Sequence, residues 1–236
     1  MPPLSAPAPD ATLPFRVGLS LSVAASVSAD RELLARGRPG VRVAVLRDRA
    51  VSIGVGVPDS SPVLARAQAL GIPVVRRPSG GSGVLHGPGD LVWSVVLPRT
   101  DPRVGRDFVR AYGRFGAGPV AALRAAGIDS AWTEPPGLDP GYCVLSDRGC
   151  VLRAGAAVLG GAAQQVTGRA LLHHGFLPRR VDRATLRDVF ALPDAAIDRL
   201  IALEDLSARA SAAWAPELAN AIARSMPWPR TRDRVT

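Results

Sequence analysis

Hydrophobic and polar positions change their spacing several times along this 236-residue chain, and each change predicts an element. Alternating, valine-rich residues at 41–57 predict two strands around a turn at Arg47–Arg49. Residues 72–77 and 90–98 predict two further strands, because both are apolar, β-branched runs bounded by turn residues. Residues 143–177 predict strands joined by tight turns at 147–149 and 167–169.

Helical spacing and helix-capping residues predict the helices between and after these strands. Residues 28–37 start with Ser28 as a potential N-cap and end at a glycine. Residues 61–71 carry Ser61, a proline at the first helical position and a terminal glycine. A longer helical segment is expected to break into two pieces at Gly116–Pro119. Three more helices are predicted at 182–190, 194–203 and 215–226.

The order of these elements predicts the fold class and the domain organisation. Strands dominate the middle, with helices before, between and after them, which predicts an α+β domain with a mixed, largely antiparallel sheet. We expect a single domain at 13–226, a disordered Pro/Ala-rich tail at 1–12 and a C-terminal tail at 227–236. No apolar run approaches the length of about 20 residues that a membrane helix needs.

Composition narrows the possible partners and compartments. The formal net charge is +9, yet the basic residues are scattered, so we expect no specific nucleic-acid partner. All 29 basic residues are arginine, and the chain contains no lysine. There are only two cysteines and no export signal is evident, which predicts a cytoplasmic protein without a disulfide framework. No Cys/His spacing typical of a metal site occurs.

The segment "RRPSGGSGVLHGPG" at 76–89 is the densest candidate for chemistry. Arg76 and Arg77 point to opposite faces if they lie on a strand, so at most one faces a ligand. His86 can donate, accept or carry a proton near neutral pH. The residues that let the backbone approach a ligand closely are Ser79, Gly80, Gly81 and Gly83. A plain glycine hairpin with two solvated arginines is the equally open alternative.

This segment resembles the signature of the lipoate–protein ligase and octanoyltransferase family, which carries an Arg-Arg-x-Ser-Gly-Gly-Gly-x-Val-x-His stretch. The matching residues are Arg76, Arg77, Ser79, Gly80, Gly81, Val84 and His86. A later block is similar to the family's Lys-Ile-x-Gly-x-Ala-Gln segment and the His-Gly that follows it. Its matching residues are Gly161, Ala163, Gln164, His174 and Gly175. The resemblance implies the biotin/lipoyl ligase-like catalytic fold.

The family's lysine is absent, because its position in the second block holds Val158. In the family that lysine contacts the acyl carbonyl and, in the ligases, the adenylate phosphate. A cation there stabilises charge that develops at the reacting centre. Arg153 or Arg169 could supply a fixed positive charge instead, and the sequence leaves open whether either does so.

Cys143 lies fifteen positions before Val158, the offset at which octanoyl-transferring relatives carry a thioester-forming cysteine. A thiol needs a nearby base or cation to ionise, and the candidates are His86 and His174, with His173 third. Neighbours on a strand face opposite sides, and the resemblance implies that His174 faces the pocket. Cys143 as a small buried hydrophobe remains an alternative. We expect Cys150 to belong to the core.

The resemblance implies transfer of an octanoyl or lipoyl group to a lysine of a lipoyl carrier domain, by one of two routes. The first passes through a Cys143 thioester, takes its acyl group from an acyl-carrier protein and needs no cofactor. The second is ATP-dependent ligation of lipoate, which needs ATP and Mg²⁺. A non-catalytic binding member of the family is a third interpretation, favoured by Val158. The implied substrate-binding residues are Arg76, Arg77, Ser79, Gly80, Gly81, Gly83, Gly161 and Ala163. No metal ligand and no membrane contact are predicted.

Overall fold

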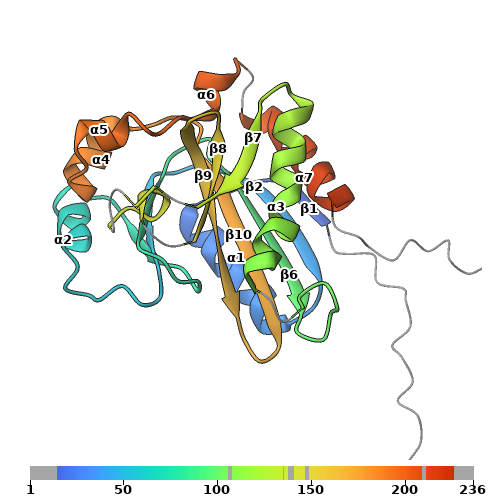
Figure 1. The fold of residues 1–236 in the computed structure, drawn as a ribbon. Coiled ribbons are helices and arrows are strands. Elements are labelled where there is room, and N and C mark those ends of the chain that lie inside the picture. Colours follow the sequence, from blue (N-terminus) through green and yellow to red (C-terminus); the bar gives the residue numbers. More distant parts are fainter. Residues whose placement is uncertain are drawn as a thin grey trace, which may run out of the picture.

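A seven-stranded sheet forms the centre of the computed structural model, which describes residues 15–105, 108–134, 136–137, 141–146, 149–208 and 211–225 (Figure 1). Its strand order is β1-β2-β6-β10-β9-β8-β7, with β1 and β2 parallel and all other neighbours antiparallel. The strands are β1 (Phe15–Leu21), β2 (Gly40–Leu46), β6 (Leu91–Pro98), β7 (Ser130–Thr133), β8 (Cys150–Ala154), β9 (Ala157–Val166) and β10 (Ala170–Leu177). The predicted α+β class with a mixed, largely antiparallel sheet is confirmed.

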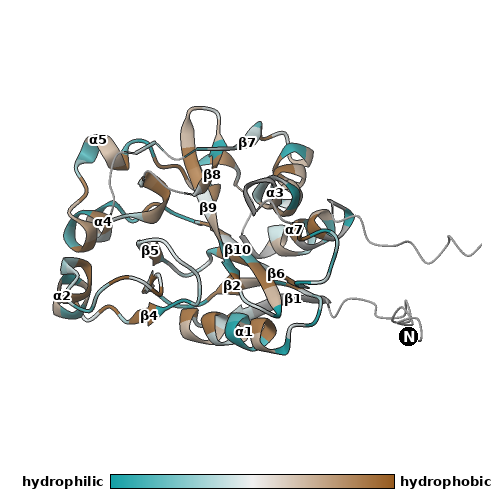
Figure 2. Cartoon of the chain, turned by 60° about the horizontal axis from the view of Figure 1, so that its bottom comes forward, coloured by the Kyte–Doolittle hydropathy of each residue, from teal (hydrophilic) through white to brown (hydrophobic). Residues whose placement is uncertain are grey.

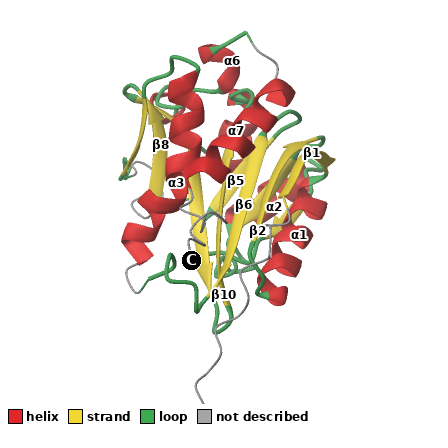
Figure 3. Cartoon of the chain, turned by 90° about the vertical axis from the view of Figure 1, so that its right-hand side faces the viewer, coloured by secondary structure: helices red, strands yellow, loops and turns green. Residues whose placement is uncertain are grey.

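Helices cover both faces of this sheet (Figure 3). Helix α1 (Val23–Arg36) lies against one face, and α3 (Phe108–Ala125) and α7 (Ser211–Ser225) pack together on the other. Trp214 and Phe115 from these two helices join Trp93 of β6 in one buried cluster. Burial of such large side chains supplies most of the stabilising free energy in a domain of this size.

A second, three-stranded sheet extends the molecule to one side (Figure 2). It contains β3 (Ala50–Ile53) flanked by β4 (Val74–Arg76) and β5 (Gly83–His86). Helices α2 (Pro62–Ala69), α4 (Arg183–Phe190) and α5 (Asp194–Ile197) gather beside it, whereas the short α6 (Leu203–Leu206) follows further along the chain. The predicted turn at Arg47–Arg49 therefore joins two different sheets, because β2 pairs with β1 and β6 while β3 pairs with β4 and β5.

Helix α1 begins earlier than the sequence predicts. Its N-cap is Ser22, whose side chain accepts a hydrogen bond from the Ala25 amide at 3.1 Å, and Asp48 accepts from the Val23 amide at 2.8 Å. The prediction that Ser28 is the N-cap is wrong, since a distant turn residue helps to cap an earlier start. The predicted end is confirmed, with Gly37 in the left-handed conformation.

Helix α3 runs through Pro119 without the predicted break at Gly116–Pro119. A Cβ on Gly118 would lie 2.5 Å from the Ile222 Cα, so this glycine lets α7 approach closely. Trp132 packs over Gly116 and donates its indole N–H to the Gly116 carbonyl at 2.6 Å. The two glycines thus serve close packing rather than a helix end.

Two other sequence predictions need correction, and several lie outside the described residues. Cys143–Leu145 form a 3₁₀ turn, not a strand, and β8 turns into β9 at Gly155, which the sequence analysis did not predict. The predicted helix at 194–203 is only the four-residue α5, while the turn at 167–169 is confirmed between β9 and β10.

The proposed tails and the boundaries at 13 and 226 lie outside the described residues. No helix in the described part of the chain is long and apolar enough to cross a membrane.

Candidate functional site

A narrow cavity, here called the small cavity, lies where α1, the large sheet and the three-stranded sheet meet. Its volume is about 80 Å³ and its lining is mostly apolar, including Val27, Val84, Trp93 and Phe176. The polar or ionisable residues in the lining are Ser26, Asp30, Arg42, Ser52, Arg77, His86, Cys143, Cys150 and His174. Several ionisable groups around an apolar cavity are a common feature of binding and catalytic sites.

Cys143 and Arg77 meet at the wall of the small cavity. The guanidinium of Arg77 approaches the Cys143 sulfur at 3.7 Å and donates to the carbonyls of Gly80 at 2.8 Å and Ser52 at 3.0 Å. Burial lowers the pKa of Arg77, and the neighbouring Cys143 sulfur opposes that shift. Arginine keeps its charge even when buried, so Arg77 supplies a fixed cation beside the sulfur.

The expectation that the two adjacent arginines face opposite ways is confirmed. Arg77 is buried against the small cavity, whereas Arg76 turns outward to Asp59 and to backbone carbonyls of residues 54–57. Arg76 lines neither this cavity nor the second one described below, so the structure does not bring this predicted binding residue to the site. Its contacts instead hold the loop after β3.

The glycine-rich loop packs over Cys143 instead of lining the cavity. Gly81 has a φ of +90°, and a Cβ there would lie 2.7 Å from both the Cys143 sulfur and an Arg77 nitrogen. A Cβ on Gly54 would lie 2.0 Å from the Gly81 carbonyl oxygen. Ser79, Gly80, Gly81 and Gly83 line neither cavity. Close approach therefore occurs at Gly81 and Gly54, where the partners are Arg77, Cys143 and the two loops themselves, whereas a Cβ on Gly80 would meet nothing within 4 Å.

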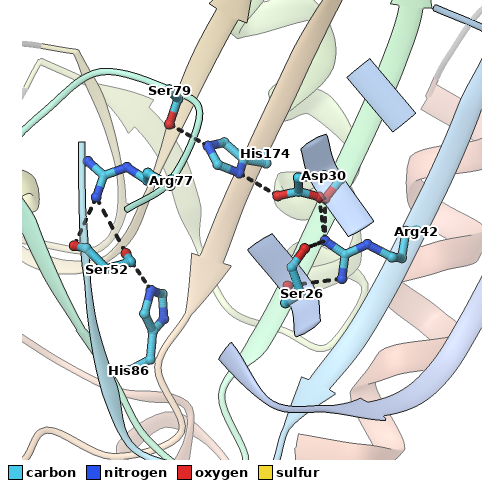
Figure 4. A network of polar contacts seen from close by, with 9 residues as sticks. Ser26, Asp30, Arg42, Ser52, Arg77, Ser79, His86 and His174 are labelled. Carbon is cyan, nitrogen blue, oxygen red and sulfur yellow. Dashed lines mark hydrogen bonds and ion pairs between the residues drawn. The ribbon is translucent and has the colours of Figure 1, made fainter. Parts of the chain in front are cut away.

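His174 of β10 sits in the middle of a chain of three side chains (Figure 4). Its Nε2 lies 2.7 Å from the Ser79 hydroxyl, and its Nδ1 lies 2.8 Å from a carboxylate oxygen of Asp30. Asp30 comes from α1 and Ser79 from the glycine-rich loop, so three separate segments meet at this ring. His174 lines the small cavity, as the sequence predicts, and Ser79 contacts the histidine instead of the cavity.

Asp30 is held by a second set of buried contacts. Arg42 of β2 donates to Asp30 at 2.5 Å, to Ser94 at 2.8 Å and to the Ser26 hydroxyl at 3.0 Å, and Ser94 also donates to Asp30. Burial alone would raise the pKa of Asp30, but Arg42 and the hydrogen bonds from His174 and Ser94 together lower it to about 2. Asp30 is therefore an ionised carboxylate with all its charge compensated inside the fold.

The sequence analysis did not identify Asp30, Arg42, Ser94 and Ser52 as site residues. Two of them, Asp30 and Arg42, leave a signal in the pattern. Asp30, like Ser26, occupies the same face of α1 as the buried Val23, Val27 and Leu34. Arg42 is likewise a charged residue within the buried run of β2. Charged residues are almost never fully buried unless they are paired, so a charge on an apolar face is a clue to a partner.

The other two histidines are both buried but differ in position. His86 lines the small cavity, bonds through Nε2 to the Ser52 hydroxyl at 2.9 Å, and has its pKa lowered to about 3, chiefly by burial. His173 faces the opposite side of β10, between Tyr112 and Phe115, and burial lowers its pKa to about 3 as well. The prediction that His173 and His174 point to opposite faces is confirmed.

Cys150 and the second sequence block complete the wall. Gly161 and Ala163 of β9 line the small cavity beside Cys150. Cys150 is half-buried in that lining, so the prediction that it belongs to the core is wrong. It lies on β8 opposite Ala162, and this register turns it toward the cavity. Burial raises the pKa of the Cys150 thiol.

A second cavity, here called the large cavity, adjoins the first and shares His86, Val144 and Phe176 with it. Its volume is about 560 Å³. Val158 lines it at the position of the family's lysine. Neither Arg153 nor Arg169 lines either cavity; Arg153 bonds Thr133 and the Ala156 carbonyl, and Arg169 lies in the exposed turn after β9. The arginines that do line it are Arg49, Arg179, Arg180 and Arg183.

Asp90 lies at the edge of the large cavity and holds the Pro-Gly turn, as one would expect of an aspartate after such a turn. It accepts from the amides of Gly87 at 2.9 Å and Arg179 at 2.8 Å. Burial raises its pKa to about 7, against the opposing effect of those two hydrogen bonds. Among the described residues, no group of three or more His, Cys, Asp or Glu side chains is placed to hold a metal ion.

The sheet, α1 and the smaller sheet around a narrow apolar cavity define a class of protein, the α+β catalytic domains with the lipoate–protein ligase fold. The crystal structure of lipoate-protein ligase A bound with ATP superposes with a TM-score of 0.68 at 26% identity, covering 91% of this chain and 84% of that one. A bi-partite lipoate protein ligase from Thermoplasma acidophilum matches with a TM-score of 0.61 at 22% identity, covering 90% and 81%.

The chain belongs to the lipoyl protein ligase A/B catalytic domain family, whose family model matches residues 25–206. Octanoyltransferase LipM of Exiguobacterium sibiricum is 31% identical over 138 residues, which are 55% of this chain and 50% of that protein. Octanoyltransferase LipM of another Exiguobacterium strain is 29% identical over 136 residues, 54% and 49% of the two chains. The chain thus aligns with about half the length of these curated relatives. The family resemblance inferred from the sequence motifs is confirmed.

Proposed function

We propose that this protein transfers an octanoyl group, through a thioester on Cys143, to a lysine of a lipoyl carrier domain. The observation that carries the proposal is the Cys143 sulfur in the wall of a narrow apolar cavity, 3.7 Å from the buried Arg77 guanidinium. A thiolate is the nucleophilic form of cysteine, and a fixed cation beside it compensates its charge. The apolar lining suits an alkyl chain, because burying each methylene group stabilises binding by about 0.8 kcal/mol.

The reaction divides into two acyl transfers. In the first, the Cys143 thiolate attacks the carbonyl carbon of an octanoyl thioester on an acyl-carrier protein, and the donor's sulfur leaves and takes up a proton. In the second, the amine of the acceptor lysine attacks the Cys143 thioester, an amide forms, and the sulfur of Cys143 leaves. His174 accepts the Cys143 proton in the first step and passes it to the leaving sulfur. In the second step it accepts a proton from the amine and returns it to Cys143.

Two similarities support this choice of substrates. The curated relatives are octanoyltransferases, and an octanoyltransferase that uses a thioester donor needs neither ATP nor a metal. The related archaeal ligase was studied together with its E2 lipoyl domain, which supports a lipoyl domain as the acceptor.

ATP-dependent ligation of lipoate is the second candidate, favoured by the large cavity and by the ATP-bound ligase with the same fold. The residues that line the large cavity are poorly suited to bind the phosphates of a nucleotide. Val158 replaces the lysine, and each cavity arginine already pairs with a carboxylate: Arg49 with Asp182, Arg179 and Arg180 with Glu204, and Arg183 with Asp198. The phosphates of ATP would therefore have to displace these carboxylates from the arginines.

Intact-mass measurement after incubation with octanoyl-acyl-carrier protein tests the proposal. We expect one octanoyl adduct on the parent protein and none on Cys143→Ala. Cys150→Ala is the matched control, since Cys150 lines the same cavity without an arginine contact to its sulfur, and we expect it to keep the adduct. A parallel incubation with lipoate, ATP and Mg²⁺ that yields lipoyl adenylate would favour the ligase. An octanoyl adduct that survives in Cys143→Ala contradicts the thioester route, and no product in either incubation points to a binding member of the family.

A further inference from the structure

The buried side chains around His174 carry an inference beyond the assignment of Cys143 as the nucleophile. We propose that Asp30, anchored by Arg42 and Ser94, is a positioning residue that fixes the tautomer and orientation of His174 for the acyl transfer. This inference rests on the proposed function for its chemistry, and on the contacts in Figure 4 for its geometry. No sequence motif described above contains Arg42 or Ser94.

The tautomer follows from the bonding capacity of the two partners. Asp30 is an ionised carboxylate and can only accept hydrogen bonds, so the His174 Nδ1 at 2.8 Å must carry the proton. In neutral His174 the Nε2 then has a lone pair, which accepts from the Ser79 hydroxyl at 2.7 Å. The ring is held from both sides, with its proton-accepting nitrogen toward the loop that packs over Cys143.

The anchoring of Asp30 explains why this arrangement is rigid. One carboxylate oxygen accepts from Arg42 and Ser94, and the other is left for His174. The side chains of Asp30 and Arg42 are each only 4% exposed, so neither can exchange its partner for water. A buried ion pair with a full set of hydrogen bonds stabilises mainly a specific arrangement, and here that arrangement orients His174.

His174 is also the histidine best placed to move a proton. Its side chain is 12% exposed and lines the small cavity together with Cys143. Burial, together with the charges of Arg77 and His174, holds the pKa of His86 at about 3, which makes it a poor base near neutral pH. His173 faces the other side of the sheet. Asp30 contacts His174 and not His86, so its effect on transfer is expected to pass through His174 alone.

The substitution Asp30→Asn tests this role with little change in shape. An asparagine has a single carbonyl oxygen, and the buried Arg42 and Ser94 donors require it, because an unpaired buried cation is costly. The amide NH₂ would then face His174 Nδ1 and force the proton onto Nε2, the wrong nitrogen for accepting one. We expect transfer to fall by about a hundredfold or more, in line with the loss of general acid–base catalysis. The donor's KM should change little, since the apolar lining remains.

A double-mutant cycle separates positioning from simple structural support. The four proteins are the parent, Asp30→Asn, His174→Gln and the double variant, all compared by transfer rate and by thermal unfolding. If Asp30 acts through His174, Asp30→Asn lowers the rate in the parent but not in the His174→Gln background, while its effect on unfolding persists in both. Equal rate losses in the two backgrounds would overturn the inference.

Nitrogen-15 NMR of the histidine side chains gives a readout that does not depend on activity. We expect the Nδ1–H tautomer of His174 in the parent and the Nε2–H tautomer in Asp30→Asn. Asp101→Asn is the control, since Asp101 is another largely buried carboxylate paired with an arginine, and it lies outside both cavities. A parent that transfers no octanoyl group would refute the proposed function. An unchanged tautomer or rate in Asp30→Asn would refute the positioning role while leaving the Cys143 route intact.

Discussion

Asp30 and Asp90 are both fully buried aspartates, one at each cavity, and the pKa values of their carboxyl groups are shifted in opposite directions. Asp30 at the small cavity has a buried arginine, a histidine and a serine as partners, and its pKa is lowered to about 2. Asp90 at the large cavity accepts hydrogen bonds from two backbone amides, and burial raises its pKa to about 7. Arg179, the cation that lowers the pKa of Asp90, has its side chain 45% exposed and bonded to Glu204.

The difference shows that burial does not decide the charge of a carboxylate by itself. Desolvation is the largest single influence on both groups, and it raises both pKa values. A guanidinium buried with the carboxylate, as in Arg42–Asp30, reverses the outcome because little solvent screens the pair. The small cavity thus contains a fixed pattern of charges, whereas the large cavity contains a group that can gain or lose a proton near neutral pH.

Replacing Arg42 with methionine is expected to have the largest effect on the free energy of unfolding. It makes Asp30 resemble Asp90, a buried carboxylate without a buried cation. The substitution leaves a buried carboxylate without its cation, and breaking a buried pair in this way typically costs about 3–5 kcal/mol. Chemical denaturation at pH 7 measures the loss. Arg179→Met near Asp90 is the control and should cost less than about 1 kcal/mol, since an exposed ion pair contributes little. Similar losses of stability in Arg42→Met and Arg179→Met would contradict the distinction between the two aspartates.

Asp90→Asn is expected to change how the free energy of unfolding depends on pH. The folded-state pKa of Asp90 lies above the unfolded value, so the folded protein binds the extra proton between about pH 4 and 7. Asp90 therefore makes stability fall as the pH rises through that window, by up to a few kcal/mol. Asp30 does the reverse: its contribution is present above about pH 4 and is lost as the pH falls toward 2.

Urea unfolding of the parent and of Asp90→Asn at several values between pH 4 and 8 measures this contribution. The difference between the two proteins cancels the titration of all other groups, including His86 and His173. We expect the variant to gain stability relative to the parent as the pH rises. A difference that does not vary with pH would mean that Asp90 is ionised throughout, like Asp30.

Gly81→Ala is expected to give the smallest change in stability but a specific effect at the small cavity. Its φ of +90° is strained for alanine, and the added Cβ would lie 2.7 Å from Arg77 and Cys143. We expect a loss of about 1–2 kcal/mol and slower formation of the Cys143 adduct, because the side chains must shift. Gly80→Ala is the matched control, with nothing within 4 Å of its Cβ. Equal adduct formation in both variants would show that the loop does not position the thiol.

Local pattern predicted a substantial part of this fold. The helix at 61–71, the end of α1 at Gly37 and the opposite orientation of Arg76 and Arg77 follow from capping rules and strand alternation. The errors arise where distant residues override local preference. Asp48 helps to start α1 early, and Ile222 and Trp132 pack onto the glycines that were expected to break α3. The prediction that Cys150 belongs to the core fails because the register of β8 against β9, which turns Cys150 toward the small cavity, cannot be read from one strand.

Residue identity and spacing are enough to identify the family, the candidate nucleophile and the valine at the position of the family's lysine. The side chains that meet at His174 follow from the packing of the folded chain. Asp30 precedes Ser94 by 64 positions and His174 by 144, and no local periodicity relates residues so far apart. Their contact depends on β2, β6 and β10 lying side by side with α1 across them. That packing also removes the water that would otherwise screen Arg42 from Asp30, and so it fixes the charge beside His174.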